Sequence, residues 1–396
     1  MPRQVKGSVH ILLKSFFSRI RVSQFLIRGR GRNDANVVQK KSNAFLIAGG
    51  AGFVGSTLAL AFRDRYPDAR VVALDSLKRR GSELNLDRLG RAGVEFIHGD
   101  VRCRDDLVFS KSRFDTIIDC SAEPAVLAAY DRGPSYIIDA NLSGTVNLLE
   151  LARRDGADFV LLSTSRVYPI AKIEAIGFRE EETRFSISPI QPFPGIGVKG
   201  ISEVFPLDGA RSLYGATKLA SEHLLEEYAE MYGLRYVIDR CGVITGAWQM
   251  GKLDQGVFAL WMGKHYFKRP LSYIGYDGLG KQVRDFVCVD ELADLVLSQV
   301  EHIDALPNRT YNVGGGVASS LSLLELTRLC EEITGNRVDI ARVVESRPAD
   351  IRLYVTDNSR VSADTDWVPR LTPHQTLSRV YEWIRDNERV VAPLWS

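Results

Sequence analysis

A glycine-rich turn at residues 49–55 limits what this chain can fold into more than any other stretch of its sequence. The turn reads Gly-Gly-Ala-Gly-Phe-Val-Gly and follows an apolar run at residues 44–48, and the residues after it have a helical pattern. In such a unit Gly49 permits the tight turn, Gly52 lets backbone amides approach a pyrophosphate, and Gly55 lets the helix pack against the strand. The turn therefore predicts a phosphate-binding loop at the start of an α/β domain.

A second apolar run, at residues 70–74, ends at Asp75, twenty residues beyond the last glycine of the turn. That separation is typical of a dinucleotide-binding βαβ unit, in which the acidic residue accepts hydrogen bonds from the ribose hydroxyls of the cofactor. A carboxylate there also repels the 2′-phosphate of NADP. Lys78, Arg79 and Arg80 could neutralise such a phosphate, but a solvated basic loop is the commoner reason for consecutive cations. The sequence predicts NAD.

Strand-like runs and helical patterns alternate along the rest of the chain, as in a parallel sheet covered by helices on both faces. The predicted strands cover residues 94–98, 116–120, 159–163 and 236–239, and the predicted helices cover residues 141–154 and 214–232. Residues 169–209 are rich in Pro, Gly, Ile and charge, which predicts a long loop lying over a site. We expect an α/β fold: a Rossmann doubly wound parallel sheet with a smaller, discontinuous C-terminal substrate lobe.

The expected organisation has three parts. A basic N-terminal extension of residues 1–43, disordered or an amphipathic helix, precedes an NAD-binding Rossmann domain of residues 44–245. Residues 246–396 belong mainly to the substrate-binding lobe, which we expect to be built from residues 246–283 and 318–375. Residues 284–315 are expected to return to the sheet.

The charge distribution argues against a nucleic-acid partner. The formal net charge is +2, yet ten Lys and Arg residues and a single acid lie before residue 43, so the body of the chain is acidic. Apolar residues at helical spacing in the extension leave a weak contact between residues 1–43 and a membrane surface open. The five cysteines form no CxxC pair, so we expect no metal site and no disulfide framework, in keeping with a reducing cytoplasm.

A second group of residues carries acid–base chemistry. Tyr214 and Lys218 are four positions apart at the head of a predicted helix, so their side chains lie on one face. A neighbouring ammonium favours the phenolate of a tyrosine and makes it usable as a base. A tyrosine and a lysine at this spacing are a weak signal alone, but Thr164 ends a predicted strand about fifty residues upstream and offers a hydroxyl partner. The three residues predict a proton relay.

Taken in order, these residues resemble the extended short-chain dehydrogenase/reductases that act on nucleotide-sugars. The likeness runs from about residue 44 to residue 384 and includes the motifs at residues 99–101, 141–145, 214–218, 282–286 and 311–314. It implies Thr164, Tyr214 and Lys218 as the catalytic set, Arg284 and Thr164 as substrate-binding residues, and a homodimer or higher homo-oligomer. The implied contacts to NAD are Gly49, Gly52, Phe53, Val54, Gly55, Asp75, Asp100, Val101, Ser121, Asn141, Tyr214 and Lys218.

Within that family the chain resembles most the CDP-paratose (CDP-tyvelose) 2-epimerases. The matching stretches are residues 163–168, 212–218, 249–257 with Trp261, and 280–285. The resemblance implies a CDP-sugar substrate whose ring carbon, expected to be C2, is oxidised by NAD and reduced again from the other face, with Tyr214 as the base. Glu123-Pro124, the segment 169–209 and Cys241-Gly242-Val243 depart from the pattern, so the sugar and the nucleobase stay open.

Other interpretations of the same motifs remain open. A 4,6-dehydratase needs an acid–base pair, usually Asp-Glu directly after the threonine, whereas this chain has Ser165-Arg166. A nucleotide-sugar 4-epimerase or a simple 4-reductase is also open, and so is an NAD-binding scaffold or sensor without turnover, which should lack one relay residue. Further candidates with weaker support are His98 and His265 as acids or bases, the carboxylates Glu181, Glu182, Glu203 and Asp350, and the aromatic residues Trp248, Trp261 and Tyr266 around a sugar pocket.

Overall fold

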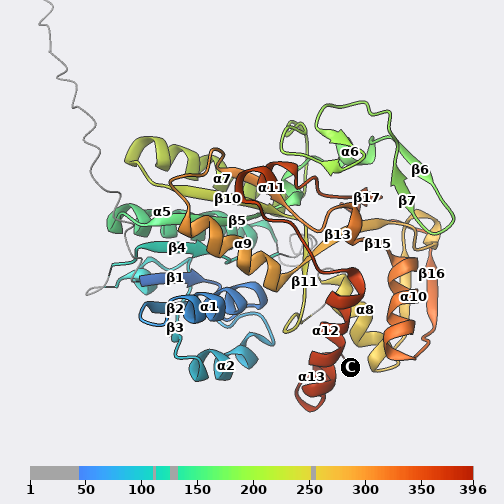
Figure 1. Ribbon diagram of the computed structural model, residues 1–396, viewed down its shortest axis with the longest axis horizontal. Helices are drawn as coiled ribbons and strands as arrows, with labels where there is room; N and C mark the ends of the chain where they lie inside the picture. Colours follow the sequence, from blue (N-terminus) through green and yellow to red (C-terminus); the bar gives the residue numbers. More distant parts are fainter. Residues whose placement is uncertain (1–43, 110–112, 125–132, 251–255, 396) are drawn as a thin grey trace, which may run out of the picture. The chain divides into compact units, whose positions relative to one another are not determined.

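Seven parallel strands form the central sheet of the computed structural model, in the order β14-β10-β5-β4-β1-β2-β3 (Figure 1). The structure describes residues 44–109, 113–124, 133–250 and 256–395. The strands are β1 (Ala44–Ala48), β2 (Arg70–Asp75), β3 (Glu95–His98), β4 (Thr116–Asp119), β5 (Asp158–Thr164), β10 (Tyr236–Cys241) and β14 (Thr310–Val313). The chain adds β2 and β3 on one side of β1 and then crosses to add β4 and β5 on the other side, so the strand order reverses between β1 and β4. An α/β sheet binds its ligands outside the carboxyl ends of the strands at such a point. The predicted doubly wound sheet is confirmed.

Helices cover both faces of this sheet, and each face has its own apolar core. On one face α1 (Phe53–Arg65) contacts α9 (Val289–Glu301), and on the other α5 (Gly144–Asp155) contacts α7 (Leu213–Tyr232). The remaining helices of this part are α2 (Leu86–Arg91), α4 (Pro134–Ile138), a π-helical turn (Asp139–Ser143) and α11 (Ser359–Thr365). Because both faces are covered, the central strands are continuous runs of buried side chains.

A second lobe adjoins the carboxyl ends of the strands. Its sheet contains β11 (Val243–Thr245), β13 (Val283–Cys288), β15 (Ser320–Ser322) and β17 (Leu353–Tyr354), and a separate pair joins β12 (Leu271–Ile274) to β16 (Ile340–Val343). Its core lies among α8 (Val257–Tyr266), α10 (Leu323–Thr334) and α12 (Pro373–Asp386), and α13 (Glu388–Trp395) follows.

Residues 284–315, expected to return to the main sheet, divide between the two sheets. β14 does form the edge of the main sheet beside β10, but β13 pairs with β11, β15 and β17 of the second sheet instead. The physical reason is that a short apolar strand does not specify its partner, because strand pairing is decided by contacts distant in sequence. The helix that follows, α9, does cover the main sheet.

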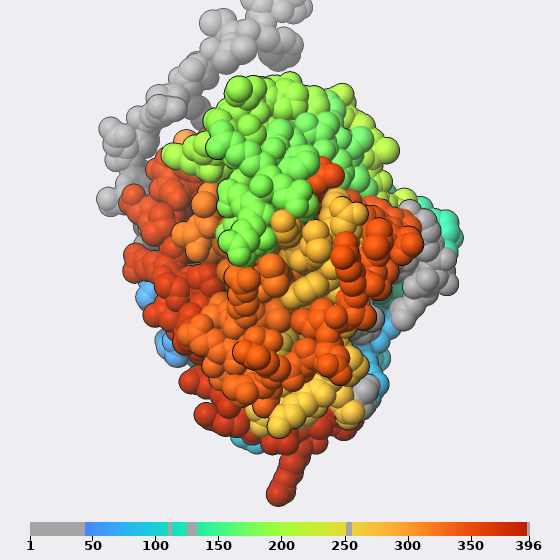
Figure 2. Space-filling view, turned by 90° about the vertical axis from the view of Figure 1, so that its right-hand side faces the viewer, coloured from blue at the N-terminus to red at the C-terminus, as the bar shows by residue number. Residues whose placement is uncertain are grey.

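The segment between residues 169 and 209, predicted as a long loop, has regular structure. It contains α6 (Ile170–Glu174) and two hairpins, β6 (Phe178–Glu180) with β7 (Phe185–Ile187) and β8 (Ile196–Gly197) with β9 (Gly200–Ile201). Buried Ile173, Ile176 and Phe205 give it an apolar core shared with the second lobe, through Ile351 and Tyr354. Figure 2 shows this segment, in green, against the gold and orange residues of that lobe.

From Ser42 onward the chain forms one compact unit, so the predicted boundary near residue 245 separates two lobes and not two independent bodies. The predicted extension of residues 1–43 lies outside the described residues, as do Asp254 and Gln255 of the motif that precedes Trp261. Within the described ranges no helix combines the length and apolarity needed to cross a bilayer.

A buried acid–amide pair joins the sheet to helix α9. Asp239 on β10 and Gln299 on α9 are both fully buried, and Gln299 Nε2 donates to Asp239 Oδ1 at 2.8 Å. In the described part of the chain Asp239 Oδ2 and Gln299 Oε1 have no hydrogen-bond partner. A proton on Oδ2 would let the carboxyl group donate to Oε1 and satisfy both atoms, and burial does raise the pKa of Asp239 to about 7.

Asp239→Asn is therefore expected to stabilise the protein at neutral and alkaline pH. The fold holds a proton that the unfolded chain releases near the ordinary aspartate pKa of 3.8, so this site's stability is present at low pH and lost as pH rises through about 7, by up to about 4 kcal/mol. Asparagine is uncharged and keeps a donor. The denaturant midpoint of Asp239→Asn should exceed that of the parent protein by an amount that grows between pH 5 and pH 8. Asp386→Asn, on the surface, is the control. A difference independent of pH would contradict a protonated Asp239.

Candidate active site

One cavity of about 700 Å³ lies at the carboxyl ends of the parallel strands, between the main sheet and the second lobe. Residues from both parts line it, which is where ligands bind in open α/β sheets. Of the predicted site residues, those lining the cavity are Gly49, Gly52, Phe53, Val54, Gly55, Asp75, Asp100, Val101, Ser121, Thr164, Tyr214, Lys218 and Arg284. The predictions made from distant parts of the sequence therefore meet at one site.

The glycine turn has no room for side chains. Gly49 has a positive φ of 71°, and a Cβ at Gly55 would lie 2.1 Å from the carbonyl oxygen of Gly49. Gly52 is the N-cap of α1 and offers no side chain to the first amides of the helix. Those amides and the positive helix end therefore face the cavity with capacity to bind a phosphate, as a dinucleotide requires.

Asp75 stands at the end of β2, where its carboxylate is held by two backbone amides. Oδ2 accepts from Ala51 N at 3.1 Å and Oδ1 accepts from Leu77 N at 2.8 Å. Burial raises the pKa of Asp75, and the amide bonds oppose this rise. The carboxylate is thus fixed beside the glycine turn, in the position where it can accept ribose hydroxyls.

The basic run after Asp75 is engaged with the protein. Lys78 Nζ lies 3.7 Å from the centre of the Tyr136 ring, Arg79 donates to the Met250 carbonyl at 3.3 Å, and Arg80 donates to the Pro393 carbonyl at 3.0 Å. These contacts give the three cations structural partners. This agrees with a basic loop whose cations serve the structure.

Asp100 and Val101 follow β3 and line the cavity. Arg102 binds the carboxylate of Asp100 through Nε at 2.9 Å and Nη2 at 2.5 Å, which lowers the pKa of Asp100. Val101 lies against Gly144, where a Cβ would be 2.7 Å from Val101 Cγ2. This part of the cavity thus combines a fixed carboxylate with an apolar wall.

Two predicted cofactor contacts differ in their placement. Ser121 lines the cavity, and its amide and hydroxyl both donate to Asp119 Oδ1, at 2.9 and 2.6 Å. Asn141 is fully buried and does not line the cavity; its Oδ1 accepts from Glu123 N at 2.7 Å and its Nδ2 donates to Glu123 O at 3.2 Å. Asn141 therefore supports the cavity wall at Glu123 and has no access to the cavity itself.

Thr164, Tyr214 and Lys218 come together because α7 begins against the end of β5. Ser212 caps the helix by accepting from Gly215 N at 3.2 Å, and a Cβ at Gly215 would lie 2.0 Å from the Arg166 carbonyl oxygen. This close approach brings the Tyr214 hydroxyl into hydrogen-bonding contact with Thr164. Lys218 follows one turn later and is 1% exposed.

Burial and nearby groups act on the Tyr214 hydroxyl in opposite directions. Burial raises the pKa of Tyr214 to about 12, while the Thr164 hydrogen bond and the charge of Arg166 oppose the rise. The Lys218 ammonium instead points to the carbonyl of Ser121, 3.4 Å from Nζ. In the free protein Arg166 is thus one cation that favours the Tyr214 phenolate.

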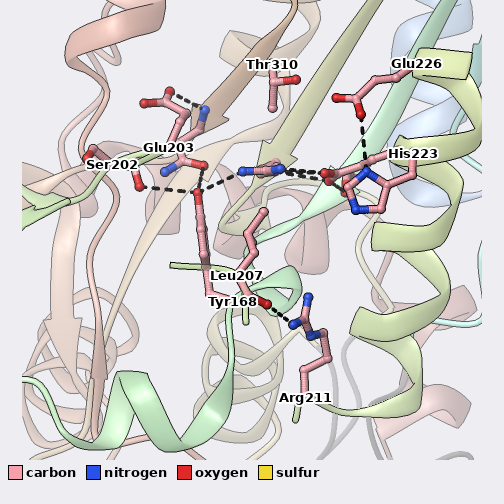
Figure 3. Close-up of polar contacts among 12 residues, drawn as sticks. Tyr168, Ser202, Glu203, Leu207, Arg211, His223, Glu226 and Thr310 are labelled. Atoms are coloured by element: carbon pink, nitrogen blue, oxygen red, sulfur yellow. Dashed lines mark hydrogen bonds and ion pairs between the residues drawn. The ribbon is translucent and has the colours of Figure 1, made fainter. Parts of the chain in front are cut away.

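A buried polar network anchors α7 behind the cavity. Glu222, two turns beyond Tyr214 on the same face, forms an ion pair of 2.7 Å with Arg240 on β10 and also accepts the Ser163 hydroxyl. Arg240 Nη1 in turn donates to the hydroxyl of Tyr168 at 3.4 Å. Figure 3 shows Tyr168 facing Ser202, which belongs to the segment 169–209, with Glu203 beside it. The network therefore links α7, β10 of the main sheet and the segment 169–209.

At the substrate end, Arg284 is held by its own surroundings. Nη1 donates to the Val283 carbonyl at 2.8 Å, and Nη2 donates to Asp350 Oδ1 at 3.1 Å and to the Ile351 carbonyl at 2.6 Å. Asp350 also lines the cavity, as does Trp261, whose Nε1 donates to Thr327 Oγ1 at 3.1 Å. The weaker candidates that do not line it are His98, His265, Glu181, Glu182, Glu203, Trp248 and Tyr266.

Two residues escaped the sequence reasoning. Arg166 was noted only as a departure from the dehydratase pattern, yet it lines the cavity beside Tyr214. Glu222 could have been found, because its spacing from Tyr214 and Lys218 puts it on the same helix face, where a buried charge needs a partner.

Comparison with known proteins fits this geometry. The model of the NAD dependent epimerase/dehydratase family matches residues 45–314. The chain is 29% identical over 352 residues to CDP-paratose 2-epimerase of Salmonella typhi, covering 85% of this chain and 98% of the relative. It is 27% identical over 366 residues to dTDP-glucose 4,6-dehydratase of Xanthomonas campestris pv. campestris, covering 87% and 93%.

Among solved structures, UDP-glucose 4-epimerase of Thermus thermophilus in complex with NAD superimposes with a TM-score of 0.69 at 25% identity, covering 86% of this chain and 99% of that chain. The glycine turn, Asp75 and the uncapped start of α1 suit the same cofactor. With the family model matching more than half of its residues, the chain belongs to the NAD-dependent epimerase/dehydratase family.

Proposed function

We propose that this protein is an NAD-dependent epimerase of a nucleotide-sugar, with a CDP-sugar as substrate and C2 as the ring carbon that is inverted. The observation that carries the proposal is one cavity in which Thr164, Tyr214 and Lys218 meet, with a serine and an arginine directly after Thr164. The similarity to CDP-paratose 2-epimerase supports the choice of sugar and carbon.

The chain's residues then have separate tasks. Tyr214 accepts the proton of the sugar hydroxyl, Thr164 holds that hydroxyl and the phenol in line, and Lys218 supplies a buried positive charge beside them. NAD, held at the glycine turn and Asp75, would supply the reversible hydride acceptor for the ring carbon. Tyr214 then returns its proton to the oxygen of the keto-sugar while hydride reaches the ring carbon on its opposite face, so the carbon is inverted and no cofactor is consumed.

A 4,6-dehydratase is the second candidate, because several relatives have that activity. Elimination of water needs an acid and a base at the sugar in addition to the tyrosine. The carboxylates lining the cavity are Asp75, Asp100, Glu123 and Asp350, as far as the chain is described, and none of them follows Thr164. Ser165-Arg166 leaves the usual place of that pair without a carboxylate, so epimerisation is the better-supported reaction.

The purified protein is expected to carry NAD and to convert one nucleotide-sugar into its epimer without added NADH. We would incubate it with CDP-, UDP-, GDP- and dTDP-sugars in normal and in deuterated water and identify the products by NMR. Hydride return predicts an epimer without deuterium on the ring. Deuterium in the ring would indicate enolisation, a 4-keto-6-deoxy product would indicate a dehydratase, and a preparation unable to retain NAD would refute the assignment.

A further inference from the structure

Arg166 enters the cavity from the short 3₁₀ turn Ser165–Val167 that follows β5. Its backbone amide donates to Thr164 Oγ1 at 3.1 Å, and its carbonyl lies against the start of α7 at Gly215. These two contacts fix the backbone of Arg166 between the strand that carries Thr164 and the helix that carries Tyr214. The side chain therefore starts from a rigid position next to the proton relay.

The guanidinium of Arg166 is buried near both a like charge and an opposite charge. It interacts with Tyr214, with the carboxylate of Asp350 and, unfavourably, with the guanidinium of Arg284. Burial and the like charge of Arg284 lower the pKa of Arg166 to about 10. An anion placed between the two guanidiniums would offset this repulsion.

Arg166 also has more free hydrogen-bond donors than Arg284. A guanidinium has five N–H donors. In the described structure Arg166 uses one of them, from Nη1 to the Ala349 carbonyl at 3.1 Å. Arg284 uses three, to Val283, Asp350 and Ile351. Arg284, predicted as a substrate-binding residue, therefore has fewer donors left for a ligand than Arg166.

We propose that Arg166 binds the diphosphate of the nucleotide-sugar together with Arg284, and that this contact brings C2 of the sugar to Tyr214. A guanidinium binds phosphate oxygens through paired donors, which sets the orientation as well as the affinity. C2 is bonded to the anomeric carbon that carries the diphosphate, whereas C4 lies across the ring. Oxidation at C2 therefore needs the diphosphate close to Tyr214, where Arg166 supplies a cation. This inference rests on the proposed function.

The test measures how much the β-phosphate adds to nucleotide binding. We would titrate the NAD-containing protein with CDP and CMP, UDP and UMP, and dTDP and dTMP by calorimetry at fixed salt. Arg166→Met keeps the side-chain length and removes the charge, Arg166→Lys keeps the charge, and Arg337→Met removes an arginine whose side chain is 89% exposed. The readout is the diphosphate-to-monophosphate affinity ratio.

Arg166→Met is expected to weaken diphosphate binding about 10- to 100-fold and to leave monophosphate binding within about twofold. Arg166→Lys should retain most of the ratio and Arg337→Met all of it. An unchanged ratio in Arg166→Met, or an equal loss for both ligands, would refute the role of Arg166 and leave the proposed function standing. A parent protein with no diphosphate preference for any of the three bases would contradict both.

Discussion

Tyr214→Phe is expected to lower kcat by about 10²- to 10⁴-fold while the protein keeps its NAD. The change removes one oxygen atom, which hydrogen-bonds to Thr164 in the free protein, and it leaves the ring that lines the cavity. Without the hydroxyl no group at this position can accept the sugar proton. Epimer formation by NMR and the dinucleotide content of the purified variant are the two measurements.

Tyr228→Phe is the matched control, because Tyr228 lies on the same helix and its hydroxyl contacts Glu150 outside the cavity. It should keep the parent's rate. If Tyr214→Phe also kept the parent's output, the relay would play no part in turnover. The alternative of an NAD-binding scaffold or sensor would then regain support.

Glu222→Ala is expected to destabilise the protein by about 3–5 kcal/mol, the usual cost of leaving one partner of a buried ion pair alone. The side chains of Glu222 and Arg240 are 1% and 7% exposed, so water cannot replace the lost contact. The loss would be measured as a shift in the urea midpoint at unchanged m-value. Glu226→Ala, four residues later on the exposed face of α7, is the control and should change stability by about 0.5 kcal/mol or less.

A double variant separates the charge pair from a general loss of packing. Replacing Glu222 and Arg240 together by methionine removes both buried charges. The loss of stability in this double variant should be clearly smaller than the sum of the losses in Glu222→Met and Arg240→Met. Additive losses would mean that the two side chains act independently. The ion pair would then not be the anchor that holds the Tyr214 and Lys218 face of α7 against the sheet.

The local features of this protein could be predicted from its sequence, because they depend on backbone geometry within a few residues. The turn at 49–55, the strand ending at Asp75 and the helix that carries Tyr214 and Lys218 all follow from glycine positions and from periodicity. Their order along the chain also determined the α/β class, since alternating strands and helices form a parallel sheet. NAD as the cofactor followed from the same turn and its acidic partner.

Contacts between distant segments could not be predicted in the same way, because many alternative pairings satisfy a short apolar strand or a charged side chain equally well. Only the tertiary structure pairs β13 with β11, folds residues 169–209 into helix and hairpins, and keeps Asn141 behind the cavity wall. It also places Arg166 in the same cavity as Tyr214. The sequence thus determined which elements form and which cofactor they suit, whereas the close approach of α7 to the end of β5 determined which side chains surround the Tyr214 hydroxyl.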